Sequence, residues 1–256
     1  MTKPVTNRMT KTAATSRLPR QKYGGTVLHC ERDAYGLIEV VDTQHMRGLF
    51  FGPGAEQSRL YFNAPMTLAL EYQEVIEQQV LNFCDQHSVK RLLMLGLGGG
   101  TLLTHLNRLL PNVTLDVVEL RQAVIDVAYR YFYLPDVPEI TPICTDAYTF
   151  MAQSHAQGAP GYDVLVIDLF DDQGMPDVFA QFEFQQHCLQ RVNTPGLVIF
   201  NVWNNPEPHI KAQTEQLISH WQHLQTEHLI THPRASFTVE RYQIHSSENI
   251  ILCIQR

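Results

Sequence analysis

The sequence has no apolar run of the roughly 18 residues that a membrane-spanning helix needs. No apolar stretch follows its basic N-terminus, as a secretory signal would require. Its 12 histidines and five cysteines include no HxH, HExxH or CxxC spacing, so no metal centre is predicted. The cysteines are odd in number and scattered, which indicates reduced, buried thiols. We therefore expect a cytoplasmic protein that binds neither a metal nor a membrane.

Acidic residues are absent from the first 30 positions, whereas six of the 19 Lys and Arg residues lie within residues 1–22. This segment is also polar and aperiodic, which predicts a disordered basic tail. The rest of the chain has 13 basic and 26 acidic residues, a net charge of −13. Such a charge disfavours nucleic-acid binding and suits a cationic small-molecule substrate.

The 256 residues are enough for one large α/β domain and a small additional one. Short β-prone runs separated by turn formers such as Gly52-Pro-Gly54 predict a small N-terminal β domain over residues 23–65. The apolar spacing then becomes helical over residues 66–84. After Lys90 strands and helices alternate, which predicts a mostly parallel sheet with helices on both faces within residues 66–256.

The expected elements of this larger domain follow from the period of its apolar residues. The strands are expected at 91–95, 114–119, 139–144, 163–168 and 196–202, the helices near 101–110, 121–132, 146–154, 177–192 and 207–226, and an antiparallel C-terminal hairpin at 237–244 and 249–255.

A glycine turn follows the first of these strands and points to a nucleoside ligand. Gly96 and Gly98 allow the backbone to turn sharply and to approach a ligand closely. Glu119, at the end of the next strand, is placed to accept hydrogen bonds from two ribose hydroxyls. At this point NAD and an adenosyl-sulfonium compound fit equally well.

The acids after the next two strands distinguish these ligands. Asp146 either accepts from the adenine amine, with Ala147 allowing close approach, or only caps the following helix. Asp168 and Asp171, with Asp172 beside them, follow the fourth strand. Several carboxylates around one crevice repel a pyrophosphate and attract a cation, so the set favours an adenosyl-sulfonium ligand.

These residues resemble motifs of the spermidine synthase (polyamine aminopropyltransferase) family, within the S-adenosylmethionine-dependent methyltransferase fold class. The resemblance covers roughly residues 24–255 and includes the small β domain. The matching segments are Gly96-Leu-Gly-Gly-Gly-Thr101 in place of GGGDGG, Glu119 in Val117-Val-Glu-Leu, Asp146 in Thr145-Asp-Ala-Tyr, Asp168-Leu-Phe-Asp171 in place of DSSDP, and Tyr72-Gln73-Glu74.

The resemblance implies a Rossmann-like fold and an aminopropyl transfer from decarboxylated S-adenosylmethionine to a polyamine such as putrescine. It implies that Asp168, with Tyr72, orients and deprotonates the attacking amine, and that Asp171 holds a cationic group. The donor-binding residues that it implies are Gly96, Gly98, Gly99, Glu119, Asp146, Ala147 and Gln73. It also implies a homodimer, for which Phe50, Phe51 and Tyr61 provide either an interface or simply core packing.

Gly99 stands where the family has the acid that holds the donor's ammonium. This departure leaves open a methyltransferase that uses intact S-adenosylmethionine, and a non-catalytic relative. Leu169 and Phe170 replace small polar residues, which makes the acceptor side more apolar. Trp203 either stacks on a ligand cation or packs in the core.

Overall fold

The computed structural model of the protein describes residues 20–256, apart from 53, 154–160, 172–173 and 232–236. The expected tail therefore lies outside the described residues up to residue 19. Its last residues, Gln21 and Lys22, pair with the next strand, so the N-terminal sheet begins slightly before residue 23.

The N-terminal sheet is an antiparallel meander in which each strand pairs with its sequence neighbour. Its strands are β1 (Gln21–Lys22), β2 (Gly25–Asp33), β3 (Gly36–Asp42), β4 (Met46–Phe51) and β5 (Ala55–Tyr61). The sequence did not predict β5, because its segment Glu56-Gln-Ser-Arg59 is polar and lacks alternation. It forms because β4 offers a paired edge, with Leu49 opposite Ser58.

The larger sheet has seven strands in the order β11-β12-β10-β9-β6-β7-β8. Its parallel strands are β6 (Arg91–Leu95), β7 (Thr114–Glu119), β8 (Ile140–Cys144), β9 (Tyr162–Ile167) and β10 (Val192–Trp203). The antiparallel hairpin of β11 (Thr238–Gln243) and β12 (Asn249–Gln255) completes it. The α/β Rossmann-like, methyltransferase-type fold and its terminal hairpin are thus confirmed.

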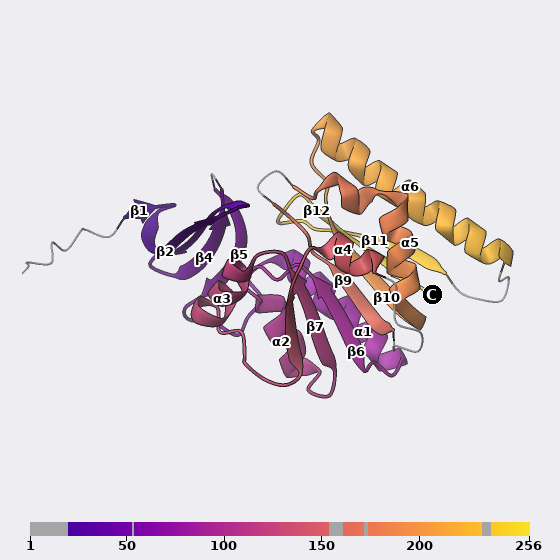
Figure 1. Ribbon diagram of the computed structural model, residues 1–256, viewed down its shortest axis with the longest axis horizontal. Helices are drawn as coiled ribbons and strands as arrows, with labels where there is room; N and C mark the ends of the chain where they lie inside the picture. The colour runs from indigo at the N-terminus through magenta and orange to yellow at the C-terminus, as the bar shows by residue number, and fades with distance from the viewer. Residues whose placement is uncertain (1–19, 53, 154–160, 172–173, 232–236) are drawn as a thin grey trace, which may run out of the picture.

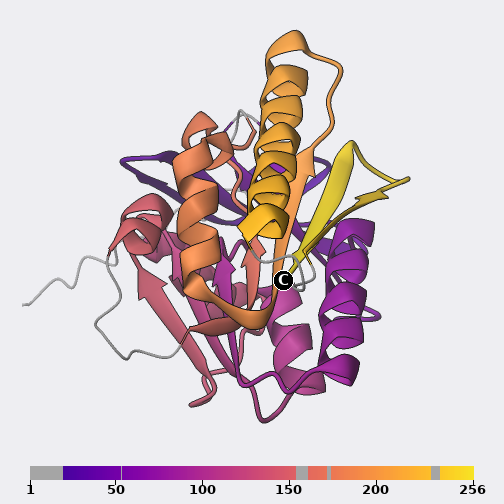
Figure 2. The same ribbon diagram turned by 90° about the vertical axis from the view of Figure 1, so that its right-hand side faces the viewer.

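Helices cover both faces of this sheet, because successive strand residues point to opposite sides. One face packs against α1 (Glu71–Gln86), α2 (Thr101–Leu109) and α3 (Gln122–Tyr131), and the other against α4 (Ala147–Ala152), α5 (Phe182–Arg191) and α6 (Pro208–Thr231). The neighbours Met94 and Leu95 of β6 belong to opposite cores. Figure 1 shows the N-terminal sheet beside the larger one, and Figure 2 shows α1 and α6 on opposite sides of it.

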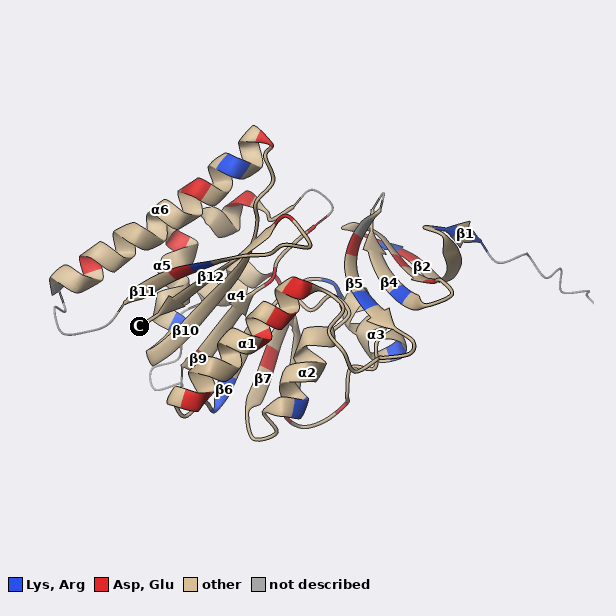
Figure 3. Ribbon diagram, turned by 180° about the vertical axis from the view of Figure 1, so that it is seen from behind, with Lys and Arg blue, Asp and Glu red and all other residues tan. Residues whose placement is uncertain are grey.

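Three expected helices have clearly different bounds in the structure. The one expected over 207–226 continues to Thr231 in α6. The helix expected from residue 66 begins at Glu71, and Figure 3 shows the acidic residues of α1 in red. The Glu71 carboxylate accepts hydrogen bonds from the backbone N–H groups of His245 and Ser246, which ties α1 to the β11–β12 turn. The helix expected over 177–192 is a 3-10 turn, η1 (Asp177–Ala180), followed by α5, and β10 starts directly after α5.

The order of the strands places a crevice beyond the carboxyl end of β6. The chain moves from β6 to β7 on one side, and β9 returns to pair with β6 on the other. Such a reversal of winding is where open α/β sheets bind ligands. The glycine turn that the sequence singled out begins at this point, with Gly96.

Candidate active site

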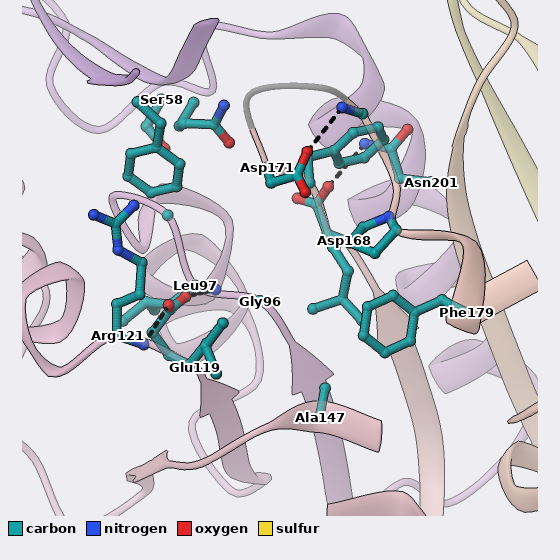
Figure 4. A pocket seen from close by; sticks show the side chains of 18 of the residues that line it. Ser58, Gly96, Leu97, Glu119, Arg121, Ala147, Asp168, Asp171, Phe179 and Asn201 are labelled. Atoms are coloured by element: carbon teal, nitrogen blue, oxygen red, sulfur yellow. Dashed lines mark hydrogen bonds between the residues drawn. The ribbon is translucent and has the colours of Figure 1, made fainter. Parts of the chain in front are cut away.

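A cavity of about 610 Å³ lies at the carboxyl ends of the parallel strands, between the larger sheet and the N-terminal sheet (Figure 4). This volume is typical of small-ligand sites. Of the predicted site residues, the cavity is lined by Tyr72, Gln73, Gly96, Gly98, Glu119, Asp146, Ala147, Asp168 and Asp171. Further lining residues that the sequence did not single out include Tyr35, Gln57, Ser58, Arg121, Asn201 and Asn249.

Only glycine fits at position 96, because the backbone there is in the left-handed region and the neighbouring strand lies very close. Its φ is +91°, and a Cβ atom there would lie 2.1 Å from the carbonyl oxygen of Asp168. Its N–H donates to the carbonyl of Val118. The turn thus brings the ends of β6, β7 and β9 together at one wall of the cavity.

Gly99, predicted to bind the donor, lies instead against the N-terminal sheet and is not among the cavity-lining residues. Its N–H donates to Ser58 Oγ at 2.7 Å. A Cβ atom at this position would lie 2.9 Å from both Ser58 Cβ and Phe132 Cδ1. The space where the related family places an acid is therefore filled by Ser58 and Phe132.

Glu119 ends β7 with its carboxylate held in the cavity wall. Its Oε2 accepts from the N–H of Leu97 at 3.1 Å, and its Oε1 accepts from the N–H of Arg121 at 3.0 Å. Burial raises the pKa of the Glu119 carboxyl, and these backbone hydrogen bonds oppose that rise. Each oxygen keeps a second lone pair, so the carboxylate is able to accept from two ligand hydroxyls.

Arg121 joins this wall to the N-terminal sheet. Its Nε and Nη2 donate to the two oxygens of Asp33, both at 2.9 Å, and Nη2 also donates to the carbonyl of Gly36. The guanidinium lies over the ring of Phe51, 4.6 Å from its centroid. Burial would raise the pKa of Asp33, but the Arg121 and backbone hydrogen bonds hold it below its ordinary value. Phe51, expected at an interface or in the core, lines the cavity.

Asp146 caps α4, the simpler of the two roles that the sequence left open. Its Oδ1 accepts from the backbone N–H of Thr149 at 2.7 Å. Asp146 and the buried Ala147 both line the cavity. One carboxylate oxygen is therefore committed to the helix, and Oδ2 remains as an acceptor for a ligand amine.

Asp168 lies on the opposite side of the cavity from Glu119 (Figure 4). Its Oδ2 accepts from Tyr72 Oη at 3.3 Å, and its Oδ1 accepts from Asn201 Nδ2 at 2.8 Å. Asn249 Nδ2 in turn donates to Asn201 Oδ1 at 2.9 Å. Burial raises the pKa of Asp168 despite these two hydrogen bonds, and burial with the Asp168 charge raises the pKa of Tyr72.

The hydrogen bonds on Asp168 from protein side chains, as far as the structure describes the chain, come from neutral groups. A carboxylate in this setting is costly to keep ionised, and an ammonium ligand offsets that cost. Asp168 and Tyr72, which the sequence predicted to act together, are brought into contact. The sequence did not predict Asn201 and Asn249, because their positions depend on the pairing of β10 with β12.

Asp171 lies at the exposed end of the same side. Its Oδ1 accepts from the N–H of Gly174 at 3.0 Å. Trp203 lines the cavity and lies against Gly174, since a Cβ atom at Gly174 would be 3.0 Å from the indole ring. Asp172 lies outside the described residues.

The described part of the chain contains neither a candidate metal centre nor a candidate membrane-spanning helix. No group of three His, Cys, Asp or Glu side chains there is arranged to hold a metal ion. No helix in that part is both long and apolar enough to cross a bilayer. Its cysteines are unpaired, and Cys30 and Cys144 are exposed rather than buried as expected.

Comparisons with known sequences agree on one family. A family model described as the spermine/spermidine synthase domain matches residues 69–240, more than half of the chain. A polyamine aminopropyltransferase of Vibrio vulnificus is 24% identical over 181 residues, 70% of this chain and 60% of that protein. One of Chromobacterium violaceum is 24% identical over 168 residues, 65% of this chain and 62% of that protein. The matched region thus spans about 60% of the length of these curated relatives.

Solved structures share the fold at low identity. A probable spermidine synthase from Corynebacterium glutamicum has a TM-score of 0.68 and 19% identity, covering 89% of this chain and 79% of that one. Human methyltransferase-like protein 13 in complex with SAH has a TM-score of 0.62 and 19% identity, covering 73% of this chain and 82% of that one.

Proposed function

Because the chain belongs to the spermine/spermidine synthase family, we propose that it transfers the aminopropyl group of decarboxylated S-adenosylmethionine to the amine of a polyamine such as putrescine. The observation that carries the proposal is the Asp168 carboxylate, which faces the cavity and is hydrogen-bonded by Tyr72 and Asn201. It provides a base and a cation site where the sheet ends.

The donor's adenosine is assigned to the wall built by β6, β7 and β8. Glu119 accepts from the ribose hydroxyls, while Asp146 Oδ2 and Ala147 receive the adenine. Gly96 and Gly98 let the ligand approach the backbone, and Gln73 faces the aliphatic tail together with Tyr72. The acids of this cavity also suit the positive sulfonium of the donor.

The transfer needs a neutral amine, because an alkylammonium with a pKa near ~10.4 has no lone pair to attack with. Asp168 accepts the proton, and Tyr72 and Asn201 hold the carboxylate in place. The amine nitrogen then attacks the methylene carbon beside the sulfonium. The carbon–sulfur bond breaks, its electron pair stays on sulfur, and methylthioadenosine leaves. Asp171 is assigned to a cationic group of the acceptor.

The test is transfer from decarboxylated S-adenosylmethionine to putrescine, measured as methylthioadenosine and spermidine formed. We expect Asp168→Asn to lower kcat by about 100-fold or more while methylthioadenosine still binds in a calorimetric titration. Undiminished transfer by this variant would contradict the assigned base. Wild-type protein that forms no product with any diamine would contradict the proposed activity itself.

A second candidate is methyl transfer from intact S-adenosylmethionine. It is favoured by Gly99, which removes the acid that would repel the methionine carboxylate, and by the likeness of the fold to a methyltransferase solved with SAH. The nucleoside product separates the two, since methyl transfer leaves S-adenosylhomocysteine.

A further inference from the structure

Two carboxamides, those of Gln57 and Gln73, are among the groups that line the cavity. We call the lining residues Gln57, Gly98, Tyr72 and Gln73 the donor-tail region. Two hydrogen bonds bring its walls together. Gly99 N–H to Ser58 joins the glycine turn to β5, and Thr101 Oγ1 to Gln73 Oε1, at 3.3 Å, joins α2 to α1. A Cβ atom at Gly98 would lie 2.8 Å from Ser58 Oγ.

The orientation of Gln73 gives this region a hydrogen-bond donor. The side chain is only 4% exposed, and its Oε1 is occupied by the Thr101 hydroxyl. Its Nε2 donates to Tyr72 Oη at 3.5 Å, and its second N–H is available to a ligand because Gln73 lines the cavity. An amide N–H matches a carboxylate oxygen, whereas an ammonium needs an acceptor. The positive end of the α2 dipole, at Thr101, favours the same charge.

The acid nearest to this region along β5 is already paired. Glu56 lines the cavity, but both of its oxygens accept from Arg59, at 2.9 and 2.5 Å. At position 99 the side-chain space is closed by Ser58 and Phe132, so no acid is presented from the turn either. The carboxylate beside Tyr72 is that of Asp168, whose oxygens accept from Tyr72 and Asn201. The described residues of the donor-tail region thus carry hydrogen-bond donors, and both carboxylates that border it, Glu56 and Asp168, are already hydrogen-bonded.

From these contacts we infer that the site also accepts intact S-adenosylmethionine and transfers its 3-amino-3-carboxypropyl group to the amine acceptor. The inference rests on the proposed function, because it uses the same acceptor side and the same attacked carbon. Gln73 Nε2–H binds the carboxylate that the decarboxylated donor lacks.

The reaction balances with the groups already assigned. The acceptor ammonium gives a proton to Asp168, and the freed lone pair forms a bond to the methylene carbon beside the sulfonium. The bond from that carbon to sulfur breaks, and its electrons neutralise the sulfur. The products are methylthioadenosine and an amine that bears an aminocarboxypropyl group, with one proton released to solvent.

The experiment supplies the full chain with putrescine and either decarboxylated S-adenosylmethionine or intact S-adenosylmethionine labelled at its carboxyl carbon. Nucleoside products and labelled amine are separated by chromatography and identified by mass spectrometry. Free S-adenosylmethionine also releases methylthioadenosine slowly by internal cyclisation, so label in the amine, above a control without protein, is the deciding signal.

Gln73→Glu tests the assigned contact, because glutamate keeps the size and the acceptor for Thr101 but places a negative charge beside the donor carboxylate. We expect the KM for intact S-adenosylmethionine to rise at least about tenfold and by more than the KM for the decarboxylated donor. Methylthioadenosine, which lacks the tail, should still bind in a calorimetric titration and so report that the variant is folded. Gln78→Glu is the matched control. Gln78 lies on the same helix, is exposed and is hydrogen-bonded to Asn82. Its replacement should leave the KM for both donors unchanged.

Carboxyl label in the amine, lost selectively in Gln73→Glu, supports the inference. Transfer from the decarboxylated donor alone overturns the inference and leaves the proposed function intact. S-adenosylhomocysteine formed from the intact donor, with no product from the decarboxylated one, overturns both in favour of methyl transfer. Absence of any nucleoside product from either donor overturns the proposed function, and the inference with it. An equal effect of Gln73→Glu on both donors overturns the assignment of the carboxylate to Gln73.

Discussion

The N–H of Gly99 donates to the hydroxyl of Ser58 at 2.7 Å, so a strand of the small N-terminal sheet fixes the glycine turn of the large one. Ser58 is only 2% exposed and fills, with Phe132, the space beside Gly99. Position 99, where the resemblance implies an acid, is thus used here for contact between the two sheets. A change at Ser58 should therefore affect both stability and the donor site.

Ser58→Ala removes the acceptor and leaves a buried N–H without a partner. We expect the free energy of unfolding to fall by about 1–3 kcal/mol, measured by urea denaturation. Ser219→Ala, on the exposed side of α6, is the control and should stay within about 0.5 kcal/mol of the wild type. Equal effects of the two substitutions would show that the Gly99 contact contributes nothing.

Gly96→Ala should be far more damaging than Gly24→Ala, although both glycines have positive φ. The Gly24 substitution meets no atom within 4 Å and should cost about 1–2 kcal/mol for its backbone conformation alone. At Gly96 the added carbon would lie 2.1 Å from the Asp168 carbonyl, so β6 and β9 must separate, and we expect an additional loss of at least about 2 kcal/mol. The denaturation midpoints of the two variants measure these losses. Similar losses of stability in the two variants would contradict the close approach of the strands.

The fall of kcat/KM at acidic pH, the acid limb of the pH profile, should follow the protonation of Asp168. Burial raises the pKa of this carboxyl, so the loss of kcat/KM on acidification is expected above the pH at which an ordinary aspartate is protonated. Tyr72 and Asn201 both donate to the ionised form and lower its pKa. Tyr72→Phe and Asn201→Leu should therefore move the limb to higher pH, with the larger shift for Asn201→Leu. A limb that stays in place or moves to lower pH would show that another group controls it.

Glu119→Gln should remove the preference for a ribose 2′-hydroxyl. The carboxylate is able to accept from two hydroxyls, whereas the amide keeps one acceptor and turns its NH₂ toward a backbone N–H. We expect methylthioadenosine to bind about 10–100-fold more weakly, measured by calorimetric titration. The 2′-deoxy analogue is the matched ligand: it should bind more weakly than methylthioadenosine to the wild type and nearly equally to the variant. An equal loss for both ligands would mean that Glu119 only supports the turn.

Much of this site was predictable because it lies at the ends of strands that are regular in sequence. The apolar run Leu92–Leu95 and the strand that ends at Glu119 both have a simple pattern, and the order of parallel strands then brings their ends together. The contact of Tyr72 with Asp168 was predicted only through the resemblance, since the two residues are 96 positions apart.

The remaining site residues depend on tertiary contacts that leave no local pattern. Gln57 and Ser58 belong to a polar strand that is defined by its partner β4 and by the glycine turn. Asn201 and Asn249 meet because β12 pairs antiparallel with β10. Arg121 is a single basic residue at the start of a helix, and its role emerges only when the hairpin that carries Asp33 lies beside it.

The bridge between Arg121 and Asp33 joins two sheets that both contribute walls to the cavity. On the proposed function, a nucleoside in this cavity would contact both sheets at once and act as a removable crosslink between them. Its binding free energy then adds to the resistance of the whole chain to unfolding, by about 2.7 kcal/mol at a concentration 100 times its Kd. If the proposed function holds, the melting temperature of this protein should rise with the concentration of donor or methylthioadenosine around it.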